Sequence, residues 1–242
     1  MAFYEFGALY HASGEPAEGF SGSGIDVDLL RELRRRSGCR FEGMVMTRAR
    51  IWSELEAARL DMTTSGIATP EREKLYAFEP YILLKHHVWM LKTHAPVSGG
   101  LAGFMADPKL RWGAVRGYRH TPAYDTALAQ ARGQGRVVEA TDDAQLLRLL
   151  AEGTVDAVIG HSVVLRRYAA DHPRKPQLQA LDWAPQASVV PEGLVLSRAR
   201  FSEAEIAGWR AMVQELLRDG TMARIMRRHV PDDEVAEMIP RE

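Results

Sequence analysis

Residues Asp61–Arg72 read DMTTSGIATPER. Asp61–Ser65 has the apolar and polar pattern of a short strand, and Gly66 permits a tight turn. Thr69 followed by Pro70 is typical of a helix start, because threonine caps a helix and proline is favoured at its first position. A loop that joins a strand to a helix start turns backbone N–H groups toward a ligand and favours an anion. This stretch predicts an α/β fold with an anion-binding loop.

Arg72 is the residue of this stretch that points to a function. It lies in the first turn of the expected helix, where the helix dipole disfavours a positive charge. A locally unfavourable residue at a loop indicates a functional role, and a guanidinium group binds a carboxylate through two parallel hydrogen bonds. The alternative is an ordinary surface ion pair with Glu71, Glu73 or Glu79. The residues alone leave both interpretations open.

Strand and helix patterns alternate along almost the whole chain. We expect strands at Phe3–Tyr10, Cys39–Met46, Arg111–Arg116, Arg136–Ala140 and Val155–Gly160, and helices at Asp26–Arg36, Ala49–Ala58, Thr121–Arg132 and Ser162–Asp171. This alternation predicts an α/β fold with mostly parallel sheets.

The composition excludes several classes of protein. The chain has 242 residues, of which 46% are hydrophobic and 26% are charged, so it forms a real core as one large domain or two compact lobes. Its net charge of −1 argues against general nucleic-acid binding, which needs a basic surface. Cys39 is the only cysteine, which excludes an internal disulfide and a thiolate metal cluster. No apolar run approaches the length of about 18 residues that a membrane-spanning helix needs.

No catalytic, metal-binding or cofactor motif is present. The chain has no His-Glu-x-x-His helix, no glycine-rich phosphate loop with lysine and no Gly-x-Ser-x-Gly turn. His86 and His87 are adjacent on an extended stretch, so their rings point to opposite faces, which is poor geometry for a metal. His161 is expected to lie alone among apolar neighbours. We therefore predict no catalytic residues, no metal and no cofactor.

Several motifs together resemble one known family. They are Gly24–Leu30 (similar to G-F-D-x-D-L), Asp61–Arg72 (D-x-x-x-S-G-x-x-x-T-P-E-R), Phe78–Tyr81 (F-x-x-P-Y), Val115–Gly117, Asp156–Ile159 and Phe201–Val230. In their order and spacing they resemble the bacterial extracellular solute-binding proteins, family 3. Members of this family bind amino acids and related small polar solutes for ABC importers.

The resemblance implies a fold and a setting. The expected fold is the type II periplasmic binding protein, with two lobes joined by two crossing hinge strands that close on the ligand. Lobe 1 would hold residues 1–90 and 189–242, lobe 2 would hold residues 91–188, and the hinge strands would be Ile82–Leu91 and Ser188–Leu196. We expect a monomer located in the periplasm, with a leader that this sequence lacks, a small-molecule solute as ligand and an ABC permease as partner.

The resemblance also implies a set of ligand-binding residues. Arg72 would bind the ligand carboxylate, with Ser65 and the backbone of Ile67 beside it. Other ligand contacts would come from Phe6 as an aromatic wall, from Arg48 and Trp52, and from Tyr118 and Arg119 in the second lobe. Nucleic acid is not an expected partner.

Three departures from the family pattern concern the ligand. Amino-acid binders usually have serine or threonine where this chain has Ile67, a small hydroxyl residue at Tyr118, and an aspartate at His161 that pairs with the ligand ammonium. An ammonium removed from water needs an anionic partner. We therefore expect a carboxylate without an α-ammonium group, or one whose amine is not recognised as in ordinary amino-acid binders. The positive charges of Arg72 and Arg119, with Arg48 or Arg116, would favour a dianion. The alternative is that Glu5 or Asp182 supplies the missing anionic partner.

Two other functions share this fold. One is the ligand-sensing domain of a histidine kinase or diguanylate cyclase. The other, which we consider less favoured, is a dehydratase that acts on prephenate-like acids. A dehydratase needs a buried acid with a raised pKa in its cleft, and the position of His161 supplies none.

Overall fold

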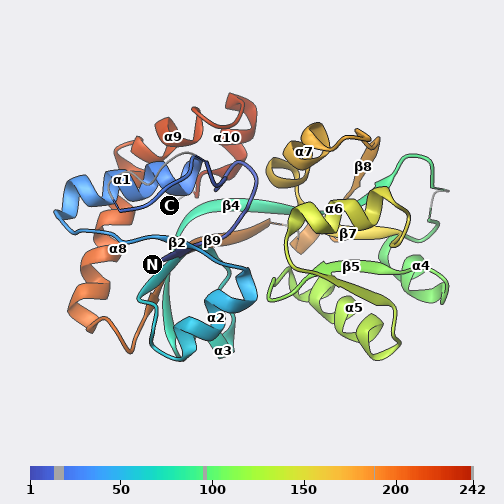
Figure 1. Cartoon of the computed structure of the whole chain (residues 1–242), viewed down its shortest axis with the longest axis horizontal. Helices are drawn as coiled ribbons and strands as arrows, with labels where there is room; N and C mark the ends of the chain where they lie inside the picture. The colour runs from blue at the N-terminus through green and yellow to red at the C-terminus, as the bar shows by residue number, and fades with distance from the viewer. Residues whose placement is uncertain (14–18, 95–96, 188, 241–242) are drawn as a thin grey trace. The chain divides into compact units, whose positions relative to one another are not determined.

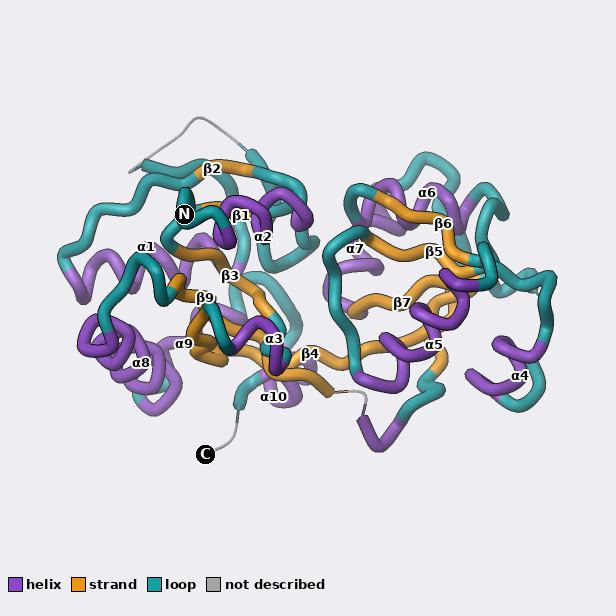
Figure 2. Tube along the Cα trace, turned by 90° about the horizontal axis from the view of Figure 1, so that it is seen from below, coloured by secondary structure: helices purple, strands orange, loops and turns teal. Residues whose placement is uncertain are grey.

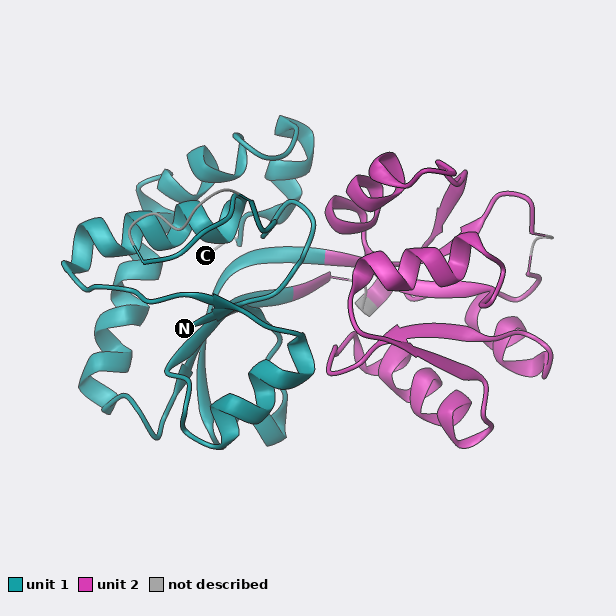
Figure 3. Ribbon diagram, in the orientation of Figure 1, with its two compact units in different colours: residues 1–84, 191–242 teal, residues 85–190 magenta. Residues whose placement is uncertain are grey.

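The computed structural model describes residues 1–13, 19–94, 97–187 and 189–240. Helices and strands alternate along the chain, so the fold is α/β as predicted (Figure 1). The chain divides into two compact units, shown in separate colours in Figure 3. Unit 1 consists of Met1–Leu84 and Pro191–Glu242, and unit 2 consists of Lys85–Val190.

Unit 1 is built on a mixed sheet. Its strands are β1 (Ala2–Phe3), β2 (Met44–Val45), β3 (Met62–Gly66) and β9 (Val189–Ser197), in the order β2-β1-β3-β9. Strand β1 runs parallel to β2 and β3, whereas β9 runs antiparallel to β3. The helices are α1 (Ile25–Ser37), α2 (Arg48–Glu56), α3 (Pro70–Glu73), α8 (Glu203–Arg218), α9 (Thr221–Met226) and α10 (Asp232–Met238).

Two strands belong partly to each unit. Strand β4 (Tyr76–Leu91) begins in unit 1 and ends in unit 2, and β9 has its first residues in unit 2. The sequence predicted both elements, at Ile82–Leu91 and Ser188–Leu196. The first residue of the second prediction, Ser188, lies outside the described residues.

The long helices of unit 1 follow local signals. Helix α1 has Asp26 and Asp28 in its first turn, where the dipole favours acidic groups, and it ends at Gly38, whose φ is 68°. Helix α8 begins with a capping box in which Ser202 and Glu205 exchange hydrogen bonds.

The strand predicted at Phe3–Tyr10 is much shorter in the structure, where only Ala2–Phe3 is a strand. The chain then turns at Gly7, whose φ is 57°.

Gly66 allows two strands of unit 1 to approach closely. It ends β3 opposite Gly193 of β9. A Cβ atom at Gly66 would lie 2.1 Å from the Cγ2 atom of Val195, which is far inside van der Waals contact. Glycine is therefore needed at this position for its size.

Unit 2 has its own sheet. The end of β4 pairs with β7 (Ala157–His161) and β8 (Leu178–Leu181), and β7 is followed by β5 (Trp112–Val115) and β6 (Val137–Ala140). Strands β5, β6 and β7 are parallel, whereas β4 is antiparallel to β7 and β8. The helices are α4 (Gly100–Ala106), α5 (Pro122–Gly133), α6 (Asp143–Ala151) and α7 (Ser162–Asp171).

Both faces of the unit 2 sheet are covered by helices, as Figures 1 and 2 show. Trp112 and Ile159 point to one face and pack with Phe104 of α4 and Tyr124 of α5. Their sequence neighbours point the other way and pack with α6 and α7, in a cluster that includes Val115, Val158, Leu146, Leu150 and Leu165. This alternation follows from the two-residue period of a strand. Within the described parts of the chain, no helix is long and apolar enough to cross a membrane.

Candidate functional site

Arg72 lies on α3 in unit 1, and its guanidinium group lies over an indole ring. The Cζ atom lies 3.7 Å from the centre of the Trp52 ring. Nη1 donates a 3.0 Å hydrogen bond to the carbonyl oxygen of Ile67. Its backbone N–H donates to the capping hydroxyl of Thr69 at 3.3 Å. Arg72 and Ile67 are both half-buried. Because a stacked guanidinium group has a fixed plane, it is pre-organised to bind a carboxylate.

Arg48 continues this stack toward the core. Its Cζ atom lies 4.7 Å from the centre of the Trp52 ring and 4.4 Å from the centre of the Tyr4 ring. Only 4% of Arg48 is exposed. Its Nη2 atom donates to the carbonyl oxygen of Ser65 at 2.9 Å, and Nη1 donates to that of Thr64 at 3.2 Å. The buried charge of Arg48 is therefore used to hold the end of β3.

These side chains form one continuous cluster, which we call the arginine–aromatic stack: Phe6, Tyr4, Arg48, Trp52 and Arg72. The rings of Phe6 and Tyr4 lie 4.8 Å apart. Arg48 and Trp52 are four residues apart on α2, so they share a face of that helix. The stack brings together four residues that the sequence predicted: Phe6, Arg48, Trp52 and Arg72.

Ser65 lies at the base of this region with its side chain turned into unit 1. Its hydroxyl donates to Asp26 at 2.9 Å and lies 2.9 Å from the hydroxyl of Tyr81. Its backbone φ is 50°, a left-handed conformation that is uncommon outside glycine. The backbone N–H of Ser65 donates to Tyr81 at 3.0 Å. The hydroxyl thus contributes to holding the strained end of β3.

Asp26 is a buried acid that sequence reasoning missed as a separate feature. It is 1% exposed, and Tyr81 donates a 2.6 Å hydrogen bond to its Oδ1 atom. Burial raises the pKa of Asp26 to about 6, against the lowering effect of its hydrogen bonds. The sequence showed Asp26 and Tyr81 only as members of two separate motifs, because nothing local links positions so far apart.

In unit 2, the predicted residues follow the carboxyl ends of two parallel strands. Tyr118 comes after β5 and donates a 2.6 Å hydrogen bond to Asp143, which is buried on α6. Arg119 is exposed. His161 ends β7, and its Nδ1 atom lies 3.1 Å from the carbonyl oxygen of Lys85. Ligands of open α/β sheets bind beyond the carboxyl ends of the strands.

The sequence predicted that His161 lies alone among apolar neighbours. The structure shows instead that it lies beside two other histidines. Its ring centre lies 4.1 Å from that of His86, and the ring centre of His86 lies 4.9 Å from that of His120. We call these three residues the histidine cluster. His86 is directly opposite His161 in the antiparallel pairing of β4 and β7. This pairing is a tertiary feature, so the sequence carried no local signal for it.

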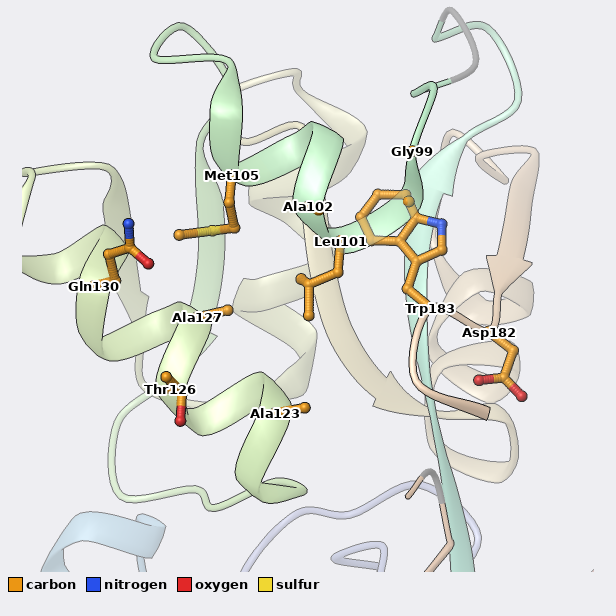
Figure 4. Close-up of a pocket in the computed structure, with 11 residues that line it drawn as sticks. Gly99, Leu101, Ala102, Met105, Ala123, Thr126, Ala127, Gln130, Asp182 and Trp183 are labelled. Carbon is orange, nitrogen blue, oxygen red and sulfur yellow. The ribbon is translucent and has the colours of Figure 1, made fainter. Parts of the chain in front are cut away.

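A separate hollow of unit 2 lies between α4 and α5 (Figure 4). It has a volume of about 680 Å³ and an apolar lining that includes Leu101, Met105, Ala127 and Trp183. Asp182 stands at its edge and forms a 2.9 Å ion pair with Lys85. The predicted ligand-binding residues do not line this hollow, whereas Asp182, which the sequence offered only as an alternative anionic partner, does.

The structure also places the acidic residues that the sequence left as alternatives. Glu79 forms a 2.9 Å ion pair with Arg210, and Glu5 lies 3.2 Å from His11. Over the described ranges of the chain, no three histidine, cysteine, aspartate or glutamate side chains are grouped so that they could hold a metal ion.

Comparison with solved structures shows the same fold in known binding proteins. An ancestral arginine-binding protein bound to arginine matches with a TM-score of 0.77 and 19% identity, over 95% of this chain and 96% of that one. A histidine kinase sensor domain similar to periplasmic binding proteins matches with a TM-score of 0.75 and 18% identity, over 95% and 93%. At these identities the likeness concerns the fold alone.

A third solved structure is an amino acid ABC transporter substrate-binding protein from Streptococcus pneumoniae bound to L-arginine. It matches with a TM-score of 0.74 and 16% identity, over 94% of this chain and 92% of that one. A comparison with curated protein sequences found no match. The family model for bacterial extracellular solute-binding proteins, family 3, matches residues 13–232. The fold is therefore that of the type II periplasmic binding proteins, and the chain belongs to the bacterial extracellular solute-binding proteins, family 3.

Proposed function

We propose that this protein binds a small carboxylate solute at the arginine–aromatic stack of unit 1 and delivers it, as a periplasmic monomer, to the permease of an ABC importer. The observation that carries this proposal is the orientation of Arg72, which is stacked on Trp52 and hydrogen-bonded to Ile67. A half-buried guanidinium group held in one plane is suited to a carboxylate. Membership of the solute-binding family supports the same interpretation.

We further propose that Ser65 and the backbone of Ile67 assist Arg72, and that Tyr118, Arg119 and His161 are ligand-binding residues of unit 2. The solute lacks an α-ammonium group that is recognised as in amino-acid binders. Two acids that would replace the missing aspartate are engaged elsewhere, Glu5 beside His11 and Asp182 with Lys85. A buried ammonium without an anionic partner is strongly disfavoured. The positive charges of Arg72 and Arg119 favour a dianion, such as a dicarboxylate or a phosphorylated acid.

We propose binding without chemistry. The acid with a raised pKa in unit 1 is Asp26, and both of its carboxylate oxygens accept hydrogen bonds, from Tyr81 and Ser65. Because Asp26 is 1% exposed, it is enclosed by its own hydrogen-bond donors. A general acid must reach the proton-accepting atom of its substrate. A structural role for Asp26 therefore accounts for its environment better than a dehydratase reaction does.

A sensory role remains the second candidate, because a histidine kinase sensor domain has the same fold. The two roles share the ligand site and differ in what the closed protein contacts. The neighbouring genes distinguish them, since an importer role predicts a permease and an ATPase beside this gene. A sensor role predicts instead that the same reading frame continues into a kinase or cyclase domain.

A thermal-shift screen tests the proposal. The panel contains monocarboxylates, dicarboxylates, phosphorylated acids and standard α-amino acids. A solute at about 100 times its Kd stabilises the folded state by roughly 2.7 kcal/mol. We expect a clear shift with a dianionic acid, which disappears in Arg72→Ala and persists in Arg59→Ala, where an exposed arginine of the same unit is removed. A large shift with an α-amino acid and none with simple carboxylates would refute the proposed ligand class.

A further inference from the structure

The histidine cluster lies at one end of the α5-covered face of the unit 2 sheet. His86 continues the row of Val88 and Met90 on β4, and His161 continues the row of Ala157 and Ile159 on β7. His120 directly precedes Thr121, the N-cap residue of α5. Three separate elements thus place imidazole rings beside the N-terminus of a twelve-residue helix.

Three buried polar atoms at this place have no hydrogen-bond partner among the residues that the structure describes. They are Nδ1 of His86, Nδ1 of His120 and Oγ1 of Thr121, and the three residues are 1%, 7% and 1% exposed. Thr121 is the N-cap of α5, yet its hydroxyl makes no capping hydrogen bond. An unsatisfied buried polar atom is costly and calls for an explanation such as a missing ligand. Three of them at one helix N-terminus indicate a site for a polar group from outside.

The charges around the cluster are mostly positive. Burial lowers the pKa of His86 well below its usual value, and the neighbouring histidines lower it further. Burial lowers the pKa of His120 to about 3, with further effects from His161, Arg132 and Arg119. Other charged or titratable groups lie around these residues: His87 also lowers the pKa of His86, Lys85, Asp182 and Arg166 act on His87, and Asp125 accepts the backbone N–H of His120.

The two acids among these groups are already engaged. Asp182 pairs with Lys85 at 2.9 Å, and Asp125 accepts the backbone N–H of His120 at 3.0 Å. The rings of His86 and His120 are therefore neutral at pH 7. If a ring of the cluster takes up a proton, the compensating negative charge must come from a bound ligand. The N-terminus of α5 favours an anion at this place.

We propose that the N-terminus of α5 and the histidine cluster form an anion site of unit 2 that takes up one proton together with the anion. The proton comes from the solvent and forms an N–H bond at a ring nitrogen of the cluster, and no other covalent bond changes. The ligand class is a small oxyanion, a carboxylate or a tetrahedral dianion. This inference rests on the proposed binding of an anionic solute and adds its regulation by pH.

Proton uptake makes the affinity depend on pH. If the bound anion restores the pKa of one ring from about 3 to the ordinary 6.5 of histidine, the anion binds about tenfold more tightly at about pH 5.5 than at about pH 8. Nearly one proton is then taken up per anion at the lower pH. Linkage is reciprocal, so the same coupling appears as a rise in the proton affinity of the ring, by roughly 3,000-fold for this change of pKa.

Isothermal titration calorimetry with sulfate and with oxalate tests this inference, because both probes keep their charge over this pH range. Each titration is repeated in two buffers that differ in ionisation enthalpy, which gives the number of protons taken up. We expect tighter binding and proton uptake at the lower pH in the whole chain. His120→Asn and His86→Asn are expected to lose the proton uptake. His172→Asn, which removes a histidine of unit 2 outside the cluster, is expected to keep it.

Nitrogen NMR of the histidine rings in the unaltered protein gives a second readout that does not depend on the folding of the variants. At about pH 5.5 we expect the rings of His86 and His120 to be neutral without sulfate, and one of these two rings to be protonated with saturating sulfate. A ring of His86 or His120 that titrates at its ordinary pKa without an anion would overturn the inference.

Three calorimetric results would also overturn it: equal affinity at both pH values, binding without proton uptake, or no binding of either probe. These failures differ from failure of the proposed function. Binding of sulfate or oxalate without proton uptake refutes this inference alone. A thermal shift with the solute that persists in Arg72→Ala refutes the proposed site in unit 1. In Arg72→Ala we expect no thermal shift at the solute concentration of the screen. At the much higher sulfate concentrations that titrate this weakened variant, we expect the proton uptake per bound sulfate to be unchanged, because the cluster belongs to unit 2.

Discussion

Tyr81 donates a 2.6 Å hydrogen bond to the buried carboxylate of Asp26, and the two residues come from β4 and α1. The same tyrosine hydroxyl accepts the backbone N–H of Ser65 at 3.0 Å. Tyr81 thus joins a strand, a helix and the strained end of β3 at one atom. The loop that leads to α3 and Arg72 begins directly after β3, so the position of Arg72 depends on buried hydrogen bonds of unit 1.

Tyr81→Phe should destabilise the protein by about 1.5–3 kcal/mol, because it removes a hydrogen bond to a charged or partly charged acid and leaves the N–H of Ser65 without an acceptor. Tyr10→Phe is the matched control. Its hydroxyl donates to the carbonyl oxygen of Ser21 at 3.1 Å, a neutral bond worth about 0.5–1.5 kcal/mol. Urea unfolding measures both variants, and equal losses would contradict the role of Tyr81.

The buried acid Asp26 should make stability depend on pH. Its pKa is about 6 in the folded protein against an ordinary value of 3.8, so the folded state binds the proton more tightly than the unfolded state. Its contribution to stability therefore rises as the pH falls from about 6 to about 4, by roughly 1.4 kcal/mol for each unit of raised pKa. The stability difference between wild type and Asp26→Asn, measured by urea unfolding across this range, should show this slope. A difference that is constant with pH would refute it.

The histidine cluster should make stability depend on pH in the opposite direction to Asp26. The pKa of His120 is lowered to about 3 in the folded protein, so below its ordinary value of 6.5 the unfolded state binds the proton more tightly. The neutral His120 ring makes its full contribution to the free energy of unfolding above about pH 6.5. Below this value the contribution decreases as the pH falls, by up to about 1.4 kcal/mol per pH unit. His120→Gln should remove this decrease. The His172→Gln control lies outside the cluster and should follow the wild type at each pH.

Arg48→Ala should destabilise unit 1 by about 2–4 kcal/mol. The change removes the donors to the carbonyl oxygens of Thr64 and Ser65 and two cation–π contacts from a buried position. Arg72→Ala should cost less than about 1 kcal/mol of stability, because Arg72 is half-buried and makes fewer of these contacts. Denaturant unfolding of the two variants gives the comparison. A larger loss of stability from Arg72→Ala than from Arg48→Ala would contradict a mainly structural role for Arg48 and a mainly ligand-binding role for Arg72.

Gly66→Ala should destabilise the protein by about 1–3 kcal/mol through overpacking, because the added methyl group would meet the stiff side chain of Val195. Gly208→Ala, at a position on α8 where a Cβ meets nothing within 4 Å, should be stabilising or neutral. Thermal unfolding of both variants tests this, and a neutral Gly66→Ala would show that β3 and β9 separate easily.

The sequence determined the α/β class and the family. It also put forward Phe6, Arg48, Trp52 and Arg72 as ligand-binding residues, which stays a prediction although the four lie in the arginine–aromatic stack. These features are carried by local signals or by motifs with fixed spacing, such as Thr69-Pro70 at a helix start and the four-residue step from Arg48 to Trp52 on one helix. The short strand β1 was harder to predict. The aromatic residues of Phe3–Tyr10 have high strand propensity, but the turn at Gly7 ends the strand after Phe3.

Tertiary structure alone decided the environment of the buried charges. Asp26 and Tyr81 meet because α1 and β4 pack in one unit, and His86 faces His161 because β4 pairs with β7 in one register. A shift of that register by one residue would bring His87 to the same place, and nothing in the local sequence selects between the two. The pKa of a buried acid or imidazole depends on desolvation and on neighbours from distant parts of the chain. Those neighbours exist only once the sheets have formed.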